Sequence, residues 1–234
     1  MLIDAGTDVG RVRKTNQDAY YISPDFRYCI VADGMGGTSG GGIASQAAID
    51  SAVEYINSEK PRGKKIAQTL KAALCTANKK VYQMSLSNKK FRGMGTTAII
   101  AYFDKGRAYF SHVGDSRVYL IRDDIKQLSE DHSVVYQLIR EGTITREEAE
   151  KHPQRSVITR AVGTDLEVDV DIFETLYKPD DVILICSDGL TNMIDDERIK
   201  DLVANGATAE ELINEANANG GKDNVTAILV RCTL

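Results

Sequence analysis

The sequence predicts an α+β protein. Short runs rich in Val, Ile, Tyr and Thr, bounded by Gly, Asp or Pro, recur along the chain and are typical of strands. Residues 104–106 and 122–124 connect closely spaced runs, which favours an antiparallel meander over repeated strand–helix–strand units. Longer stretches between other runs carry apolar residues at helical spacing. The 234 residues, 42% apolar and 27% charged, have an ordinary globular composition.

The elements follow from this patterning. The predicted strands are residues 27–33, 96–103, 107–113, 116–122, 181–187 and 223–231. The predicted helices are residues 41–58, 64–86, 195–204 and 208–219. Residues 132–152 are helical in pattern and strongly charged, and strands resume only near residue 167, which indicates an inserted, partly exposed subdomain. Because no repeat or linker divides the chain, we expect a single domain over residues 1–234.

The charge and the cysteines of the chain indicate which binding partners and which cellular location to expect. The chain has 29 basic and 34 acidic residues, and its net charge of −5 argues against nucleic acid or an anionic membrane as the main partner. Its four cysteines are scattered singly, unlike those of zinc sites or disulfide scaffolds. Asp4 and Asp8 interrupt any signal peptide, and no apolar run is long enough to span a membrane. We therefore expect a soluble cytoplasmic protein, and a monomer.

Four aspartates stand where a strand is predicted to end or begin: Asp33, Asp115, Asp188 and Asp223. Each one alone is compatible with an ordinary turn, because Asp-Gly is a common strand terminator. Together they could converge at one edge of a compact sheet system, where like charges repel unless a cation lies between them. Carboxylate ligands suit Mg²⁺ or Mn²⁺, and two such ions can activate a shared water for in-line attack on phosphorus.

The motifs resemble those of the type 2C metal-dependent serine/threonine protein phosphatases (PPM) in their compact bacterial form. The matching segments are residues 7–18, 31–37, 93–97, 112–117, 152–155, 186–190 and 220–226, in the expected order. The resemblance implies a four-layer αββα sandwich, with two central antiparallel sheets flanked by helices. It also implies a flap, a small mobile subdomain beside the cleft, over about residues 132–164.

The resemblance assigns a role to each matching position. Asp33 would bridge two catalytic Mn²⁺ or Mg²⁺ ions, Asp188 and Asp223 would hold the first ion, and Gly34 would offer its carbonyl to the second. Asp18 would bind metal through water, and Asp115 would hold a third, weaker ion. Arg13 would grip the substrate phosphate, a role that suits a planar guanidinium. The catalytic residues would be Arg13, Asp33 and Asp188.

The implied activity is hydrolysis of phosphoserine and phosphothreonine in proteins. The nucleophile would be a water activated by the two metals, with no phosphoenzyme. Phosphorylated proteins would be the substrates, and a bacterial serine/threonine kinase would be the opposing partner. Covalent catalysis lacks a partnered nucleophile, because no triad is evident and Cys186 lies in an apolar strand.

The sequence departs from the family pattern after the Asp-Gly-Met-Gly-Gly motif. Thr38 and Gly41 stand where bacterial relatives have His and Glu. The family His is regarded as a general acid, and threonine does not titrate near neutrality, so we expect reduced but real activity. The glycines at 40–42 are expected to loosen the loop, so that the first helix starts later or frays.

The three histidines are not assigned to catalysis. His112 is expected to be a packed, hydrogen-bonded core residue, because it lies in a predicted strand. His132 and His152 bracket the flap and are candidates for helix caps.

Two other hypotheses compete with a phosphatase. In one, the fold is kept but Thr38 and the glycine run mark a sensor or binding module of low activity. In the other, the glycine-rich stretch after residue 33 binds a nucleotide. Its spacing does not match Gly-x-Gly-x-x-Gly, and no Gly-Lys-Ser or Gly-Lys-Thr follows.

Overall fold

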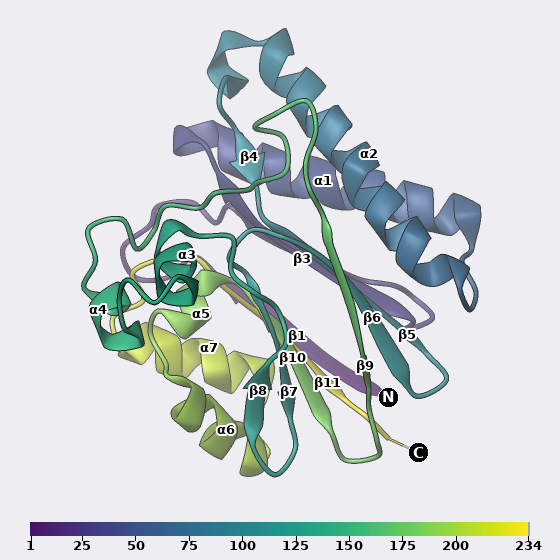
Figure 1. Cartoon of the computed structure of the whole chain (residues 1–234), viewed down its shortest axis with the longest axis vertical. Helices are drawn as coiled ribbons and strands as arrows, with labels where there is room; N and C mark the ends of the chain where they lie inside the picture. Colours follow the sequence, from purple (N-terminus) through teal and green to yellow (C-terminus); the bar gives the residue numbers. More distant parts are fainter. Residues whose placement is uncertain (234) are drawn as a thin grey trace.

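Two antiparallel sheets form the centre of the molecule (Figure 1). The computed structural model describes residues 1–233, and the side chains of residues 38 and 39 lie outside the description. Sheet A has the order β1 (Leu2–Asp8), β11 (Val225–Arg231), β10 (Val182–Cys186), β7 (Arg117–Ile121) and β8 (Ile125–Gln127). Sheet B has the order β2 (Asp18–Ile22), β3 (Tyr28–Met35), β5 (Ala98–Asp104), β6 (Arg107–Val113) and β9 (Asp171–Leu176), with β4 (Gly95–Thr96) paired to β3.

Helices cover the outer face of each sheet. Helices α1 (Gly37–Glu59) and α2 (Lys65–Ser87) pack on sheet B, and the 3₁₀ helix η1 (Lys89–Phe91) follows them. Helices α5 (Asp188–Thr191), α6 (Asp196–Ala204) and α7 (Ala209–Ala218) pack on sheet A. Helices α3 (Val134–Arg140) and α4 (Arg146–Glu150) belong to the flap segment, residues 132–164, and lie at the same end of the molecule as α5 (Figure 1). The predicted α+β sandwich of four layers is confirmed.

Strand periodicity divides the interior into three apolar layers. In β3, Tyr28, Ile30 and Ala32 face the helices α1 and α2, whereas Cys29 and Val31 face the second sheet. This alternation follows from the period of two in a strand. Both faces of the central strands are buried, so these strands consist almost entirely of apolar residues. For this reason they could be predicted from the sequence.

The main helices obey the predicted spacing. In α2, the buried residues Ile66, Leu70, Ala73 and Leu74 recur every three or four positions and form the face toward sheet B. Helices α4 and α7 each start at a capping box; in α7, Thr208 and Glu211 bond reciprocally. Among the described residues, no helix is both long enough and apolar enough to span a membrane.

The structure corrects the expectations around the first helix. Helix α1 begins at Gly37, before the predicted start at residue 41. A Cβ on Gly41 would lie 2.6 Å from the Gly34 carbonyl oxygen, so the glycine run lets two backbones pack closely and does not loosen the loop. Strand β3 also continues past Asp33 to Met35, because Gly34 and Met35 pair with β4. Asp33 therefore lies within a strand and not at its end.

Strands β1, β2 and β8 fall outside the predicted strand ranges. Strand β1 contains Asp4, Gly6 and Asp8, residue types that are depleted in strands, so its sequence lacks a strand signal. It forms because it pairs along its whole length with the strongly apolar β11, from Leu2 with Arg231 to Asp8 with Val225. Tertiary pairing thus overrides the local preference.

Candidate active site

Asp33 and Asp18 lie opposite each other on neighbouring strands of sheet B. The backbone of Asp33 is held on both sides: its N–H donates to Thr97 Oγ1 (2.9 Å), and its carbonyl accepts from Thr97 N (2.8 Å) and Thr96 Oγ1 (2.8 Å). Its position continues the alternation of Cys29 and Val31, whose side chains face the space between the sheets. The carboxyl group of Asp33 is therefore fixed by rigid elements.

Asp18 joins the two sheets through its side chain. Its Oδ2 accepts hydrogen bonds from Ser187 Oγ and Thr226 Oγ1, both at 2.7 Å, and these residues lie at the ends of strands of sheet A. Its Oδ1 is buried and has no hydrogen-bond partner among the described residues. A buried carboxylate oxygen is normally satisfied, so this atom faces the position of a further ligand.

Asp188 and Asp223 approach the same place from sheet A. Asp188 is the first residue of α5, directly after β10 and Ser187, and its Oδ2 accepts from Asn192 Nδ2 at 2.9 Å. Asp223 precedes β11, and its Oδ1 accepts from the Asn224 N–H at 2.9 Å. The predicted final strand began at residue 223, and the structure corrects this start to Val225.

Asp115 lies in the turn between β6 and β7, where it is half-buried. The turn is tied to the backbone support of Asp33, because Ser116 Oγ and Thr97 Oγ1 are hydrogen-bonded at 2.8 Å. The residue that follows Asp115 therefore contacts the same threonine that supports Asp33.

These carboxyl groups interact strongly enough to perturb one another. Burial and then the charges of Asp18, Asp188, Asp115 and Asp223 raise the pKa of Asp33 well above its ordinary value. Burial, partly offset by the two hydroxyl donors, raises the pKa of Asp18 to about 6. Burial and then Asp188 raise the pKa of Asp115 to about 8, and burial and then Asp223 raise the pKa of Asp188. The five predicted aspartates thus form one electrostatic cluster.

The cluster fits divalent cations. Its members are hard oxygen donors, its carboxyls resist ionisation in the absence of a counter-charge, and the Asp18 Oδ1 atom lacks a partner. Among the described residues, no three His, Cys, Asp or Glu side chains already converge as a metal cage.

Gly34 is packed closely against neighbouring backbone. Its N–H donates to the Gln17 carbonyl at 3.1 Å, and a Cβ at this position would lie 2.1 Å from the Gly41 oxygen. Only glycine fits here, and its carbonyl stays next to Asp33 in β3. The side chain of Thr38, which replaces the family His, lies outside the described residues.

Arg13 contacts the cluster through Asp223. Its Nη2 donates to Asp223 Oδ2 at 2.7 Å, although both side chains are partly exposed. The loop that carries Arg13 is fastened by Asn224, whose side chain accepts from Gln17 N (2.8 Å) and donates to the carbonyls of Val9 (2.9 Å) and Thr15 (3.0 Å). Sequence reasoning gave Asn224 no role, although the residue stands within the 220–226 motif.

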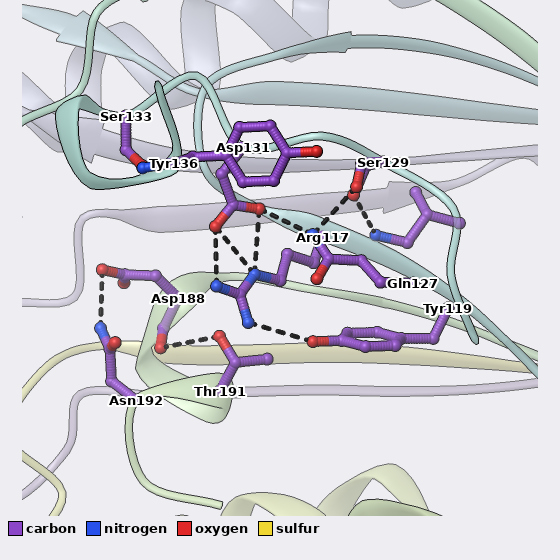
Figure 2. A network of polar contacts seen from close by, with 11 residues as sticks. Arg117, Tyr119, Gln127, Ser129, Asp131, Ser133, Tyr136, Asp188, Thr191 and Asn192 are labelled. Atoms are coloured by element: carbon purple, nitrogen blue, oxygen red, sulfur yellow. Dashed lines mark hydrogen bonds and ion pairs between the residues drawn. The ribbon is translucent and has the colours of Figure 1, made fainter. Parts of the chain in front are cut away.

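A partly buried ion pair lies beside Asp188. Figure 2 shows the Arg117 guanidinium between the Asp131 carboxylate and the Tyr119 hydroxyl, with Asp188 and Asn192 alongside. Arg117 Nη2 lies 2.7 Å from Asp131 Oδ2, and Arg117 Nη1 donates to the Tyr119 hydroxyl at 3.2 Å. This pair was also missed, because nothing in the sequence spacing joins Arg117 to Asp131.

A family model described as protein phosphatase 2C matches residues 5–229. The chain is 38% identical to the protein phosphatase PhpP of Streptococcus pneumoniae, over 98% of this chain and 97% of that protein.

Solved structures give the same picture. The structure is similar to the Mycobacterium tuberculosis serine/threonine phosphatase PstP/Ppp, at 36% identity and a TM-score of 0.91, covering 100% of this chain and 99% of that one. It is also similar to the catalytic domain of the phosphatase PstP in complex with two manganese ions, at 33% identity and a TM-score of 0.87, covering 97% of this chain and 96% of that one.

Proposed function

The chain belongs to the protein phosphatase 2C family, and from this premise we propose that its aspartate cluster hydrolyses phosphoserine and phosphothreonine in proteins. The protein is a metal-dependent serine/threonine phosphatase that acts on phosphoproteins. The observation that carries the site assignment is the electrostatic coupling of Asp33 to four other aspartates, with an unpartnered buried oxygen on Asp18.

The proposed metal ligands are Asp33, Asp188, Asp223 and the Gly34 carbonyl, with Asp18 acting through water. When bound, two divalent cations supply Lewis acidity toward phosphoryl oxygens and lower the pKa of water. We propose Mn²⁺ or Mg²⁺ for these positions, and a third, weaker ion at Asp115. The chain itself contributes preorganisation, because Thr97, Ser187 and Thr226 hold Asp33 and Asp18 before any substrate arrives.

Arg13 is proposed to bind the substrate phosphate. Its guanidinium remains charged at any relevant pH and offers paired N–H donors, which suit phosphate oxygens. The side chain is 54% exposed beside Asp223, so its free donors are accessible to a phosphopeptide. The same contact places it at the edge of the aspartate cluster, where the phosphorus centre must lie for attack.

We propose one catalytic domain over residues 1–234, with the flap at residues 132–164. We also propose that a cognate serine/threonine kinase opposes the protein, that the protein is a monomer and that it is cytoplasmic. These proposals follow from the family membership, the net charge of −5 and the scattered cysteines.

A phosphopeptide panel tests the proposed substrate class. Matched peptides that carry phosphoserine, phosphothreonine or phosphotyrosine at one position are incubated with the protein and Mn²⁺, and released phosphate is measured. The proposal expects release from the first two peptides at least about tenfold faster than from the third, and none in chelator. Equal release from all three would contradict the assignment. No release from folded, Mn²⁺-loaded protein would favour the sensor hypothesis.

A further inference from the structure

The flap segment closes on itself at its base. Its two ends are joined by the bond from the Thr159 N–H to the His132 carbonyl (2.7 Å) and by the isolated bridge between Ser133 and Ile158. Val134 N also donates to the Val157 carbonyl at 2.9 Å. We call these joined ends, residues 132–134 and 157–160, the neck of the flap.

His132 fastens the neck to the turn that carries Asp115. Its backbone N–H donates to the Gly114 carbonyl at 2.8 Å, and its Nδ1 accepts from the Gly114 N–H at 3.0 Å. Both polar groups of the Gly114 backbone are therefore satisfied by one residue of the flap. Asp115 is the next residue along the chain, so the position of its backbone depends on His132.

The other ring nitrogen of His132 faces the start of β9. Nε2 lies 3.1 Å from Asp171 Oδ2 and 3.2 Å from Arg160 Nη1, and Arg160 Nη1 donates to Asp171 Oδ1 at 2.8 Å. Because Nδ1 accepts a hydrogen bond from a backbone N–H, it carries no proton, so Nε2 bears the hydrogen and donates to Asp171. The ring is buried and stacks on His112 with a centroid distance of 4.7 Å. Its orientation is thus fixed from three sides.

We propose that His132 is a positioning residue that holds the Asp115 turn and both ends of the flap as one unit. The proposal rests on the proposed function, in which Asp115 is a cation ligand. Displacement of the flap neck changes the position of the Gly114 backbone through two hydrogen bonds, and that change reaches Asp115. This role differs from that of a helix cap, which belongs to Ser133, whose side chain accepts from Tyr136 N.

Two near-isosteric variants separate the hydrogen bond at Nδ1 from the hydrogen bond between Nε2 and Asp171. In His132→Asn, the side-chain oxygen replaces Nδ1 and can accept from the Gly114 N–H, but the bond to Asp171 is lost. In His132→Gln, the amide nitrogen replaces Nε2 and can donate to Asp171, but the Gly114 N–H loses its acceptor. Both side chains carry a neutral amide, so each variant is the control for the other.

Amide hydrogen exchange of the whole 234-residue chain, without metal or substrate, tests the positioning directly. We expect exchange of the Gly114 amide to rise about tenfold in His132→Gln and to stay near wild type in His132→Asn. We expect the Mn²⁺ concentration for half-maximal phosphate release to rise several-fold in His132→Gln, with kcat at saturating Mn²⁺ within about twofold of wild type.

Two results would overturn the proposal. One is a Gly114 amide that exchanges equally slowly in wild type and both variants. The other is an equal rise of exchange throughout the chain, which would mark His132 as a general stabiliser. The exchange arm needs no catalysis, so failure of the proposed function would appear separately, as wild-type protein that releases no phosphate.

Discussion

Arg13 Nη2 donates a hydrogen bond to Asp223 Oδ2 over 2.7 Å, so the proposed phosphate-binding cation and a proposed metal ligand are paired with each other. The pair is partly exposed, with 54% of the Arg13 side chain and 36% of the Asp223 side chain accessible, and such pairs are weak. A cation that binds Asp223 competes with Arg13 for this carboxylate. If Asp223 binds metal as proposed, metal binding would release Arg13 from Asp223 and free it to bind phosphate.

Arg13→Ala separates phosphate binding by Arg13 from the competition of Arg13 with metal for Asp223. Loss of the guanidinium should raise KM for a phosphothreonine peptide about 10- to 100-fold, the worth of a charge-assisted pair of hydrogen bonds. Mn²⁺ affinity measured by calorimetry should stay equal or increase, because Asp223 loses a competitor. A fall in Mn²⁺ affinity would show that Arg13 supports the metal site and does not compete with it.

Asp33→Asn should stabilise the metal-free protein while abolishing activity. The raised pKa of Asp33 means that its ionised form is disfavoured in the fold, by burial and by the surrounding carboxylates. A neutral amide removes this cost, so Tm in chelator at pH 7 should increase. Thermal unfolding of both proteins in chelator checks this, and a lower Tm for the variant would contradict the electrostatic interpretation.

The ion pair between Arg117 and Asp131 is expected to contribute to the stability of the fold. Asp131→Ala removes the acceptor of a guanidinium whose side chain is only 29% exposed, and should lower the free energy of unfolding by about 3 kcal/mol. Urea denaturation measures this loss. Arg198→Ala, which breaks an exposed pair with Glu215, is the matched control and should cost less than about 1 kcal/mol. Equal losses would mean that burial of the Arg117 pair is unimportant.

His112 gives the protein an acid-sensitive core. Burial and then the neighbouring His132 lower the pKa of His112 from 6.5 to about 3, with Asp171 and Arg160 also acting on it. The unfolded chain therefore binds a proton between these two pH values that the folded chain does not. Stability is fully present above pH 6.5 and is lost as pH falls toward 3, by up to about 1.4 kcal/mol per pH unit.

His112→Phe keeps a ring against His132 and removes this titration. The free energy of unfolding should fall less on acidification from pH 6.5 to pH 5 in the variant than in wild type, the difference being up to about 1.4 kcal/mol per pH unit. The buried aspartates, such as Asp18 with its pKa of about 6, take up protons in the fold over the same range in both proteins, so the difference between the two proteins isolates His112. Asp171, whose pKa is lowered by its bonds to His132 and Arg160, adds its own loss only below about pH 4. If the free energy of unfolding falls with acid as steeply in the variant as in wild type, His112 is not the cause of the acid sensitivity.

Thr38→His tests the departure from the family pattern. If a missing general acid limits the reaction, the variant should turn over a phosphothreonine peptide about 100-fold faster at saturating Mn²⁺. Thr38→Ala is the control and should leave the rate within about twofold of wild type. Equal rates for the histidine variant and the wild type would show that protonation of the leaving group does not need this position.

Much of the site could be predicted because its residues lie in continuous motifs. Asp33 with Gly34, and Asp188 after an apolar strand, occupy positions at which a carboxylate has no packing purpose. The doubly buried strands are similarly clear, since every residue of β10 from Val182 to Cys186 is buried.

Contacts between distant segments could not be predicted in this way. His112 was expected to be hydrogen-bonded, but neither ring nitrogen has a partner among the described residues, and it stacks on His132. His132 and His152 were candidate helix caps, whereas the caps are Ser133 and Thr145. Such contacts depend on how the flap neck meets the β6–β7 turn, which no local spacing encodes.

Phosphate release measured together with bound manganese tests the central claim most directly. Wild-type protein and Asp188→Ala are compared with Mn²⁺ and in chelator, using a phosphothreonine peptide, with metal content determined on the same samples. The account predicts about two tightly bound Mn²⁺ ions and metal-dependent release in the wild type. In the variant it predicts less bound metal and release at least about 100-fold slower. Undiminished release from Asp188→Ala, or equal release in chelator, would contradict it.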